Sequence, residues 1–304
     1  MKNEWHYNLT VPQSMDNVPL KRLLGEYYRL PKHLIYSIRK AQRVTVNSKY
    51  QPVNFNVHLN DQIALDFIPA DFVNPFPNVA VTHNKNIEIL FETPDVIVIN
   101  KQRGDKTHPN QPGENGTTIN QLAGYLQNQE VLPYMIHRLD METSGAIIFA
   151  KSPAAVPPLV DDIRHKVTQR SYLSWVHGTF STESGMIDIP IGRDPQDKRK
   201  RKPDEITGQK AITHYQVCES YYGYSLVKIN LETGRTHQIR VHLASIGHPL
   251  VGDPLYATDK FENLLLHSET VTFKLPFYQN VVAVKAPIPS DFSQFKQYIN
   301  NPND

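Results

Sequence analysis

The segment YMIHRLDMETSGAIIFAKS, residues 134–152, places a carboxylate directly before an apolar run that predicts a buried strand. A carboxylate held there, away from bulk water, stays ionised only beside a cation or hydrogen-bond donors. Arg138 is two residues from Asp140 in an extended loop and points elsewhere. Arg235, in the turn ETGRT between a predicted strand and a predicted helix, can reach from the sheet end toward Asp140. Such a pair is either a structural ion pair or part of a reactive site.

Other arrangements of reactive residues are disfavoured by their spacing. Ser144, His137 and Asp140 lie within eight residues, whereas the members of a hydrolase triad converge from separate segments, and METSG lacks the first glycine of the G-x-S-x-G turn. His237 and His242 are five residues apart, not four with a glutamate between them, so we expect no metal site there. His237 is instead expected to cap a helix or to touch a phosphate.

The composition predicts a cytoplasmic protein of roughly two domains. A single cysteine, Cys218, excludes an intramolecular disulfide and a multi-cysteine zinc site. The start of the chain lacks the basic-then-apolar order of a signal peptide, and no apolar stretch approaches the ~20 residues needed to cross a bilayer. With 32 basic and 30 acidic side chains, the net charge of +2 does not indicate a partner by itself.

Basic residues are concentrated in two segments. Between Lys21 and Lys49 there are eight Lys or Arg residues and one acid, Glu26. A second run lies in the loop DPQDKRKRKPDE. Such clusters attract polyanions, because neutralising phosphates releases counterions, although a solvated basic face has the same pattern. The side chains that we expect to contact a polyanion are Lys32, Arg39, Lys40, Arg43, Lys198, Arg199, Lys200, Arg201 and Lys202.

The spacing of apolar residues predicts a small N-terminal module. Residues 19–49 have a helical period that Pro31 interrupts, which predicts two helices. Three short strands follow, so we expect a module of two helices and a small sheet over residues 1–70. Residues 71–86 are proline-rich and without a helical period, which predicts a linker.

A larger domain is predicted over residues 87–295, with a C-terminal tail over 296–304. Val96-Ile97-Val98-Ile99 is apolar on both faces and predicts a fully buried strand. Helices are expected near 118–128, 153–167 and 236–245, among strands that account for most of the rest. Helices inserted among strands, rather than alternating with them, predict an α+β fold and not a doubly wound parallel sheet.

Several segments resemble the RluA family of RNA pseudouridine synthases. HRLDMETSG (137–145) resembles the HRLD signature of that family, and TGRTHQIRVHLASIGHPLVGDPLY (233–256) resembles its second long signature. RSYLSWVHG (170–178) is similar to its tyrosine-bearing strand, and PIGRDP with GQKAITHYQV is similar to its intervening segment. The resemblance covers about residues 89–290, in order. The first 70 residues resemble the small RNA-binding module of ribosomal protein S-four.

The resemblance implies a fold and a site. The fold is a mixed, largely antiparallel sheet domain with a small α/β RNA-binding module. The catalytic aspartate of the family falls on Asp140, its active-site tyrosine on Tyr172 and the paired arginine on Arg235. Leu266 matches the aliphatic residue under the target base. Arg138 matches the arginine near the flipped nucleotide, and His137, His237 and Gln238 are further expected substrate contacts.

The implied activity is the isomerisation of uridine to pseudouridine in structured RNA, without cofactor or metal. The target nucleotide must be flipped out before its glycosidic bond can be reached. The first family motif departs here: INKQRGDKTHP has Gln102 for a proline and Asp105-Lys106-Thr107 where apolar residues are expected, so we expect this loop to contact RNA and to affect substrate choice.

Three questions remain open from sequence. The ribosomal-type module favours ribosomal RNA over transfer RNA as the partner of a monomeric enzyme. A non-catalytic RNA-binding or ribosome-assembly factor is the alternative class, although the aspartate, tyrosine and arginine positions are all filled. The sequence also leaves open whether Asp140 attacks the ribose or the uracil, or acts as a base.

Overall fold

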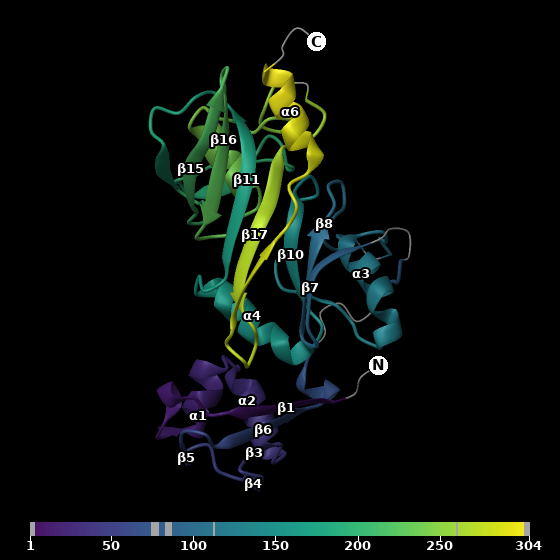
Figure 1. Ribbon diagram of the computed structural model, residues 1–304, viewed down its shortest axis with the longest axis vertical. Coiled ribbons are helices and arrows are strands. Elements are labelled where there is room, and N and C mark those ends of the chain that lie inside the picture. Colours follow the sequence, from purple (N-terminus) through teal and green to yellow (C-terminus); the bar gives the residue numbers. More distant parts are fainter. Residues whose placement is uncertain (1–3, 74–78, 83–86, 112, 260, 301–304) are drawn as a thin grey trace.

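The computed structural model describes residues 4–73, 79–82, 87–111, 113–259 and 261–300. A small N-terminal module lies at one end of the molecule, and a domain built on one long sheet extends away from it (Figure 1). The predicted α+β class is confirmed. Residues 74–78 and 83–86 of the predicted linker lie outside the described residues. The described part of the linker binds the larger domain, because Thr82 donates its N–H to the carbonyl oxygen of Asn120.

The module is a four-stranded sheet with two helical segments on it. Its sheet order is β1-β6-β3-β4. The strands of this sheet are β1 (Trp5–Thr10), β3 (Val44–Val46), β4 (Lys49–Tyr50) and β6 (Gln62–Phe67), while β2 (Val18–Pro19) and β5 (Asn56–Val57) form a separate pair. The helices are α1 (Leu20–Arg22), continued by a π-helical turn over Leu23–Tyr27, and α2 (Lys32–Lys40). The break at Pro31 is confirmed. Strand β1 was not predicted, although its buried Trp5, Tyr7 and Leu9 alternate with polar residues.

The module extends slightly past the predicted boundary at residue 70. Phe72 packs edge-on against Trp5, with ring centroids 5.8 Å apart. Arg43 donates to Asp71 through its two terminal guanidinium nitrogens, Nη1 and Nη2, at 2.5 and 2.7 Å. The Asp71 side chain is only 1% exposed, so this buried ion pair fixes residue 71 to the module.

The larger domain is organised around a ten-stranded sheet. Its main path runs β12-β15-β16-β11-β17-β10-β8-β7, with β18 beside β17 and β9 beside β10. Among the described residues, only the β10–β17 pairing is parallel. The strands are β7 (Glu88–Glu92), β8 (Val96–Lys101), β9 (Tyr134–Met135), β10 (Ser144–Ala150), β11 (Gln169–His177), β12 (Ser184–Asp188), β15 (Ile212–Tyr221), β16 (Tyr224–Leu231), β17 (Leu266–Lys274) and β18 (Val281–Lys285), with a separate pair β13 (Ile191–Arg193) and β14 (Arg201–Pro203).

Helices cover both faces of this sheet. Helix α3 (Thr118–Leu126) and helix α5 (Gln238–Ser245) share one core with Ile97 and Ile99 of β8. Helix α4 (Val156–Arg164) packs on the opposite face with Val96 and Val98, so the predicted two-sided burial of β8 is confirmed. Helix α4 tolerates two prolines in its first turn, where the missing N–H groups have no helical partner in any case.

The C-terminal segment is a helix and not a tail. Helix α6 (Ser290–Asn300) crosses the boundary that we predicted at residue 295, and residues 301–304 lie outside the described residues. Phe292, Phe295 and Ile299 recur at helical spacing and are buried against Trp175 of β11. This apolar spacing was present in the sequence, and burial of all three side chains holds residues 296–300 in the helix.

The module is joined to the larger domain by contacts at one interface. Phe277, in the hairpin between β17 and β18, is 2% exposed and enters the core of the module beside Tyr7 and Tyr28. Arg29 of the module pairs with Asp161 and Asp162 of α4 at 2.8 and 2.7 Å. These contacts place the module against the C-terminal end of α4, where Ile163 and Arg164 line the pocket described below. In the described part of the chain, no helix is long and apolar enough to cross a membrane.

Candidate active site

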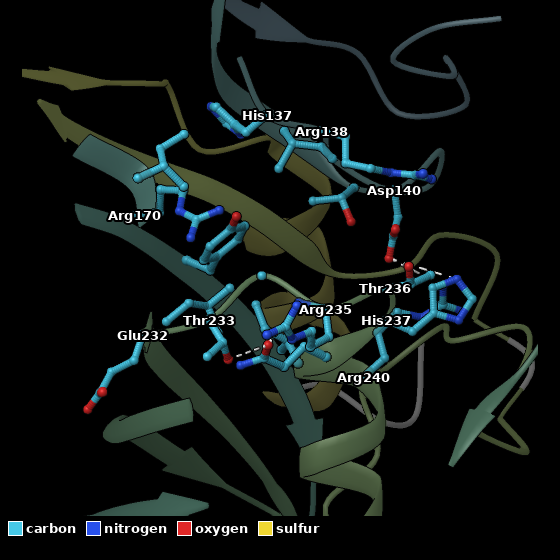
Figure 2. A pocket seen from close by; sticks show the side chains of 18 of the residues that line it. His137, Arg138, Asp140, Arg170, Glu232, Thr233, Arg235, Thr236, His237 and Arg240 are labelled. Carbon is cyan, nitrogen blue, oxygen red and sulfur yellow. Dashed lines mark hydrogen bonds and ion pairs between the residues drawn. The ribbon is translucent and has the colours of Figure 1, made fainter. Parts of the chain in front are cut away.

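A cavity of about 560 Å³ opens where the ends of several elements meet. It is lined by the loop before β10, the end of α4, the first half of β11, the turn before α5, and Leu266 at the start of β17. Figure 2 shows Asp140, His237 and Arg240 on one side of it and Arg170 on the other. Among the site residues predicted from sequence, His137, Arg138, Asp140, Tyr172, Arg235, His237, Gln238 and Leu266 all line this cavity.

The loop that carries Asp140 is hydrogen-bonded to the loop of the first family motif, residues 99–109. Thr107 accepts the N–H of Leu139 and donates its hydroxyl to the carbonyl oxygen of the same residue, at 3.2 and 2.8 Å. The buried Lys101 donates to the carbonyl oxygen of Met141 at 3.1 Å. Asp105 and Thr107 are 7% and 3% exposed, so these two departures from the family motif are buried, whereas Gln102 is exposed, and the contact of this loop with RNA stays a prediction. The Thr107 hydroxyl thus holds the backbone beside Asp140, whereas Asp105 accepts a hydrogen bond from the Gln121 amide of α3 at 3.2 Å.

The cation nearest the Asp140 carboxylate is Arg240 and not Arg235. One Asp140 oxygen lies 3.8 Å from Nη1 of Arg240 and 3.9 Å from Nε2 of His237. Arg235 is exposed in the turn before α5, and its Nε donates to the carbonyl oxygen of Lys210 at 3.0 Å. The predicted pairing of Asp140 with Arg235 is therefore wrong. The reason is that Arg240 lies on α5, which is buried from Gln238 to Leu243, and so points inward.

Arg240 is fixed by a second carboxylate. Its Nε and Nη2 donate to the two oxygens of Asp253, each at 2.7 Å, and its guanidinium lies 5.1 Å from the ring centre of Tyr256. Burial opposes the charge, but the hydrogen bond and the charge of Asp253 raise the pKa of Arg240 above its usual value. The two-point contact orients the guanidinium, which leaves Nη1 facing Asp140.

His237 and Gln238 have local structural roles. His237 stands at the N-terminus of α5 in the left-handed region (φ 58°), but its side chain makes no capping hydrogen bond, and its Nδ1 contacts the Tyr256 hydroxyl at 2.9 Å. Burial lowers the pKa of His237, although the charge of Asp140 opposes this. Gln238 accepts from Thr233 and from the Arg235 N–H, and donates to Ile212 and Thr213. Its amide is fully used within the protein, which corrects the predicted substrate contact.

Tyr172 and Leu266 come from adjacent antiparallel strands, β11 and β17. Both side chains are buried and line the cavity with Asp140. Burial raises the pKa of the Tyr172 phenol, the charge of Arg170 opposes this, and that of Asp140 adds to it. Tyr172 is therefore a neutral phenol at neutral pH, with an apolar ring face available for stacking.

His137 is a neutral imidazole whose Nε2 accepts the N–H of Ile148 on β10 at 3.1 Å. Burial, with a smaller effect from the charge of Arg170, lowers its pKa to about 3 from 6.5. Below pH 6.5 the unfolded chain binds a proton that the folded chain does not, so this group stabilises the fold above pH 6.5 and the stabilisation is lost as the pH falls toward 3.

We expect His137→Gln to reduce the loss of stability in acid, because glutamine can accept the same hydrogen bond without titrating. Between pH 6.5 and about 4.5 the wild-type protein should lose about 2 kcal/mol more unfolding free energy than the variant. Urea unfolding at both pH values measures the difference. His33→Gln, at an exposed position of α2, is the control. Equal acid sensitivity of His137→Gln and wild type would contradict the assignment.

Comparison with known proteins matches both parts of the chain. Residues 95–245, which include Asp140, Tyr172 and Arg240, match the RNA pseudouridylate synthase family. Residues 7–63 match the RluD ribosomal pseudouridine synthase N-terminal domain. The uncharacterised RNA pseudouridine synthase YhcT of Bacillus subtilis is 35% identical over 289 residues, which cover 93% of this chain and 94% of that protein. This chain belongs to the RNA pseudouridine synthases.

Two further comparisons describe the relatives of this synthase. Ribosomal large subunit pseudouridine synthase D of Neisseria meningitidis serogroup A is 32% identical over 311 residues, covering 95% of the synthase and 81% of the relative. The structure of human RNA Pseudouridylate Synthase Domain Containing 1 covers 71% of the synthase and 95% of the human chain, with a TM-score of 0.57 and 24% identity. The second likeness concerns the fold alone.

The basic residues predicted to bind RNA lie in different surroundings. Lys32, Lys40, Lys198, Arg199 and Lys202 are exposed, as is Arg138 at the cavity, whereas Lys200 and Arg201 are half-buried and Arg39 lies 5.3 Å from the ring centre of Tyr36. Arg43 is not available, because its guanidinium holds the buried Asp71. Its prediction as an RNA contact is therefore corrected to a structural ion pair.

The basic loop is connected to the cavity of the synthase. The N–H of Arg201 donates to the Tyr256 hydroxyl at 2.7 Å, and this hydroxyl also contacts His237 beside Asp140. The charge of Arg201 contributes to the lowered pKa of His237. The basic run is therefore anchored at Arg201 to the group of side chains beside Asp140.

Sequence reasoning missed Arg240, Asp253, Lys101 and Arg170. Arg240 and Asp253 were inside the quoted signature, and an arginine between two apolar residues of a helix, with an aspartate downstream, is a recognisable signal of a buried ion pair. Lys101 ends the apolar strand β8, where a lysine pointing inward must find carbonyl oxygens. Arg170 has the weakest signal, since it is one of several cations at strand ends.

Proposed function

We propose that this synthase isomerises uridines of ribosomal RNA, with Asp140 as the catalytic carboxylate. The observation that carries the proposal is the position of Asp140: its carboxylate is one-fifth exposed, faces Arg240 and His237, and shares one cavity with Tyr172 and Leu266. The reaction breaks the bond from uracil N1 to ribose C1′, rotates the base and joins C5 to C1′. A proton leaves C5 and a proton is taken up at N1, so atoms and electrons balance.

The surrounding groups complement the negative charge of the Asp140 carboxylate. Arg240 presents a fixed positive charge that needs no reorganisation during the reaction, because Asp253 holds it in place. Tyr172 offers its ring to the flipped uracil, and Leu266 supports the base from the adjacent strand. The Asp140 carboxylate can act as a nucleophile toward the ribose or the uracil, or as a base that removes the C5 proton.

Ribosomal RNA is favoured by the N-terminal module. The module is similar to a domain named for a ribosomal pseudouridine synthase, and a relative named as a large-subunit synthase matches 95% of the chain. We infer that a monomer binds this RNA with both the module and the basic loop. Pseudouridine mapping of ribosomal and transfer RNA from cells lacking the protein tests the proposal. Loss of a transfer-RNA site alone, restored by the wild-type gene, would overturn the ribosomal assignment.

Neutralising the basic loop should weaken RNA binding and reduce its dependence on salt. Each lost phosphate contact reduces the slope of log K against log salt by about 0.7–0.9. Because Arg199 already pairs with Asp197, we expect the change of residues 198–202 to glutamine to remove about three contacts and to raise Kd by about 10–100-fold at 0.15 M salt. Filter binding over a salt series measures both, with Lys285→Gln, which is exposed on β18, as control. An unchanged slope would show that the loop does not contact RNA.

A further inference from the structure

Arg170 is a buried cation in the cavity with no assigned role. It lies on β11 two residues before Tyr172, so both side chains project from the same side of the strand, and both line the cavity. Arg170 is 8% exposed. In Figure 2 it faces the cavity from the wall opposite Asp140 and His237.

The guanidinium of Arg170 lacks a protein anion among the described residues. No carboxylate there lies within ion-pair distance of it, and its buried Nε has no hydrogen-bond partner. The buried Arg240 and the half-buried Arg43 each hold an aspartate at two points. An unpaired charge in such a place costs stability, so a purely structural role does not account for it.

Its neighbours keep the Arg170 guanidinium free. Glu232, the other carboxylate near this wall, is engaged by Lys166 and by His214 at 2.8 Å. A Cβ atom at Gly234 would lie 3.2 Å from Nη1 of Arg170, so the glycine leaves room for the guanidinium. The positive charge acts on the cavity, because it opposes protonation of His137 and favours ionisation of Tyr172.

We propose that Arg170 is a catalytic residue that donates hydrogen bonds to an oxygen of the detached uracil. This inference rests on the proposed function. When the bond from N1 to C1′ breaks, its electron pair stays on the base, and the negative charge spreads from N1 over O2 and O4. With the ribose at the Asp140 wall, the base extends toward the opposite wall, where Arg170 lies. A flanking phosphate fits less well, because it stays on the RNA backbone near solvent.

The symmetry of the rotation suits one fixed donor. Turning uracil about the axis through N3 and C6 exchanges N1 with C5 and O2 with O4. A guanidinium that holds O2 before the rotation therefore meets O4 after it, in the same place. Arg170 can stabilise the charge of the base throughout, while C5 moves to C1′ and then loses its proton, and N1 takes one up.

Single-turnover kinetics with a ribosomal RNA fragment containing the mapped uridine test this role. For Arg170→Met we expect the rate at saturating enzyme to fall by at least about 100-fold, as for the loss of a preorganised donor, with Kd within about threefold of wild type. Arg170→Lys should recover the rate to within about tenfold of wild type, because it restores the charge without the fork. The melting temperature of Arg170→Met should not fall, since no ion pair is broken.

The outcomes separate the possible roles. Arg164→Met, at an exposed arginine of the same cavity, is the contrast, for which we expect a raised Kd. An Arg170→Met protein with a raised Kd and a normal rate at saturation would assign Arg170 to a phosphate and overturn the proposal. A fall in rate, affinity and melting temperature together, without recovery by lysine, would make the residue structural and also overturn it. Wild-type protein that converts no uridine would instead refute the proposed function.

Discussion

Asp140→Asn is expected to lower the rate of pseudouridine formation by at least about 10⁴-fold. The substitution keeps the shape of the side chain and removes the charge that faces Arg240 at 3.8 Å. An amide can neither attack carbon nor accept a proton as a carboxylate does. RNA binding should change little, since the basic loop and module are untouched. Single-turnover conversion of a ribosomal RNA fragment, with Kd measured on the same fragment, gives both quantities.

A matched carboxylate on the same loop provides the control. Glu142 lies two residues after Asp140 and does not line the cavity. Glu142→Gln should therefore keep the rate within about threefold of wild type, because no contact with the reacting base is lost. If Asp140→Asn retained wild-type activity, the catalytic assignment of Asp140 would be wrong. The alternative class, a non-catalytic RNA-binding factor, would instead be supported by a wild-type protein that forms no pseudouridine.

Arg240→Met should reduce both stability and activity. It leaves the Asp253 carboxylate, which is 0% exposed, without its counterion, and breaking a buried pair from one side costs about 3–5 kcal/mol of unfolding free energy. The melting temperature should fall by roughly 6–20 °C for a protein of this size. The rate of pseudouridine formation should fall by at least about 100-fold, because Asp140 loses its fixed cation. Calorimetry and single-turnover kinetics measure the two effects.

The double variant Arg240→Met with Asp253→Asn separates these effects. It removes both charges, while asparagine can still accept the N–H groups of Leu255 and Tyr256 that Asp253 now accepts. We expect most of the lost stability to return and the activity to stay low. Recovery of activity along with stability would show that Arg240 is needed only for folding. Arg235→Met, at the position that the sequence indicated, should leave the melting temperature unchanged.

Local patterns in the sequence were enough to identify the main elements and several residues of the cavity. The buried strand β8, the break at Pro31 and the helix before Gly247 depend on spacing within about a dozen residues, and the structure has all three. Asp140, Tyr172 and Leu266 were identified by resemblance, and they line one cavity. Strand β1 and helix α6 were missed although their apolar spacing was visible in the sequence.

Only the tertiary structure decided which cation meets Asp140. Arg235 and Arg240 are five residues apart in one motif, but Arg235 lies in the exposed turn before α5 and Arg240 lies on the buried part of the helix, so the packing of α5 beside the β10 loop brings Arg240 to Asp140. The tertiary structure also decided the surroundings of three other side chains. Arg43 forms an ion pair, the Gln238 amide is hydrogen-bonded within the protein, and Arg170 lies in the cavity without an ion-pair partner among the described residues. The sequence by itself determined the types of reactive groups and the elements that carry them. Their pairing was decided by packing between segments up to a hundred residues apart, because side-chain direction is set by how whole elements rotate against each other, and no local pattern contains that rotation.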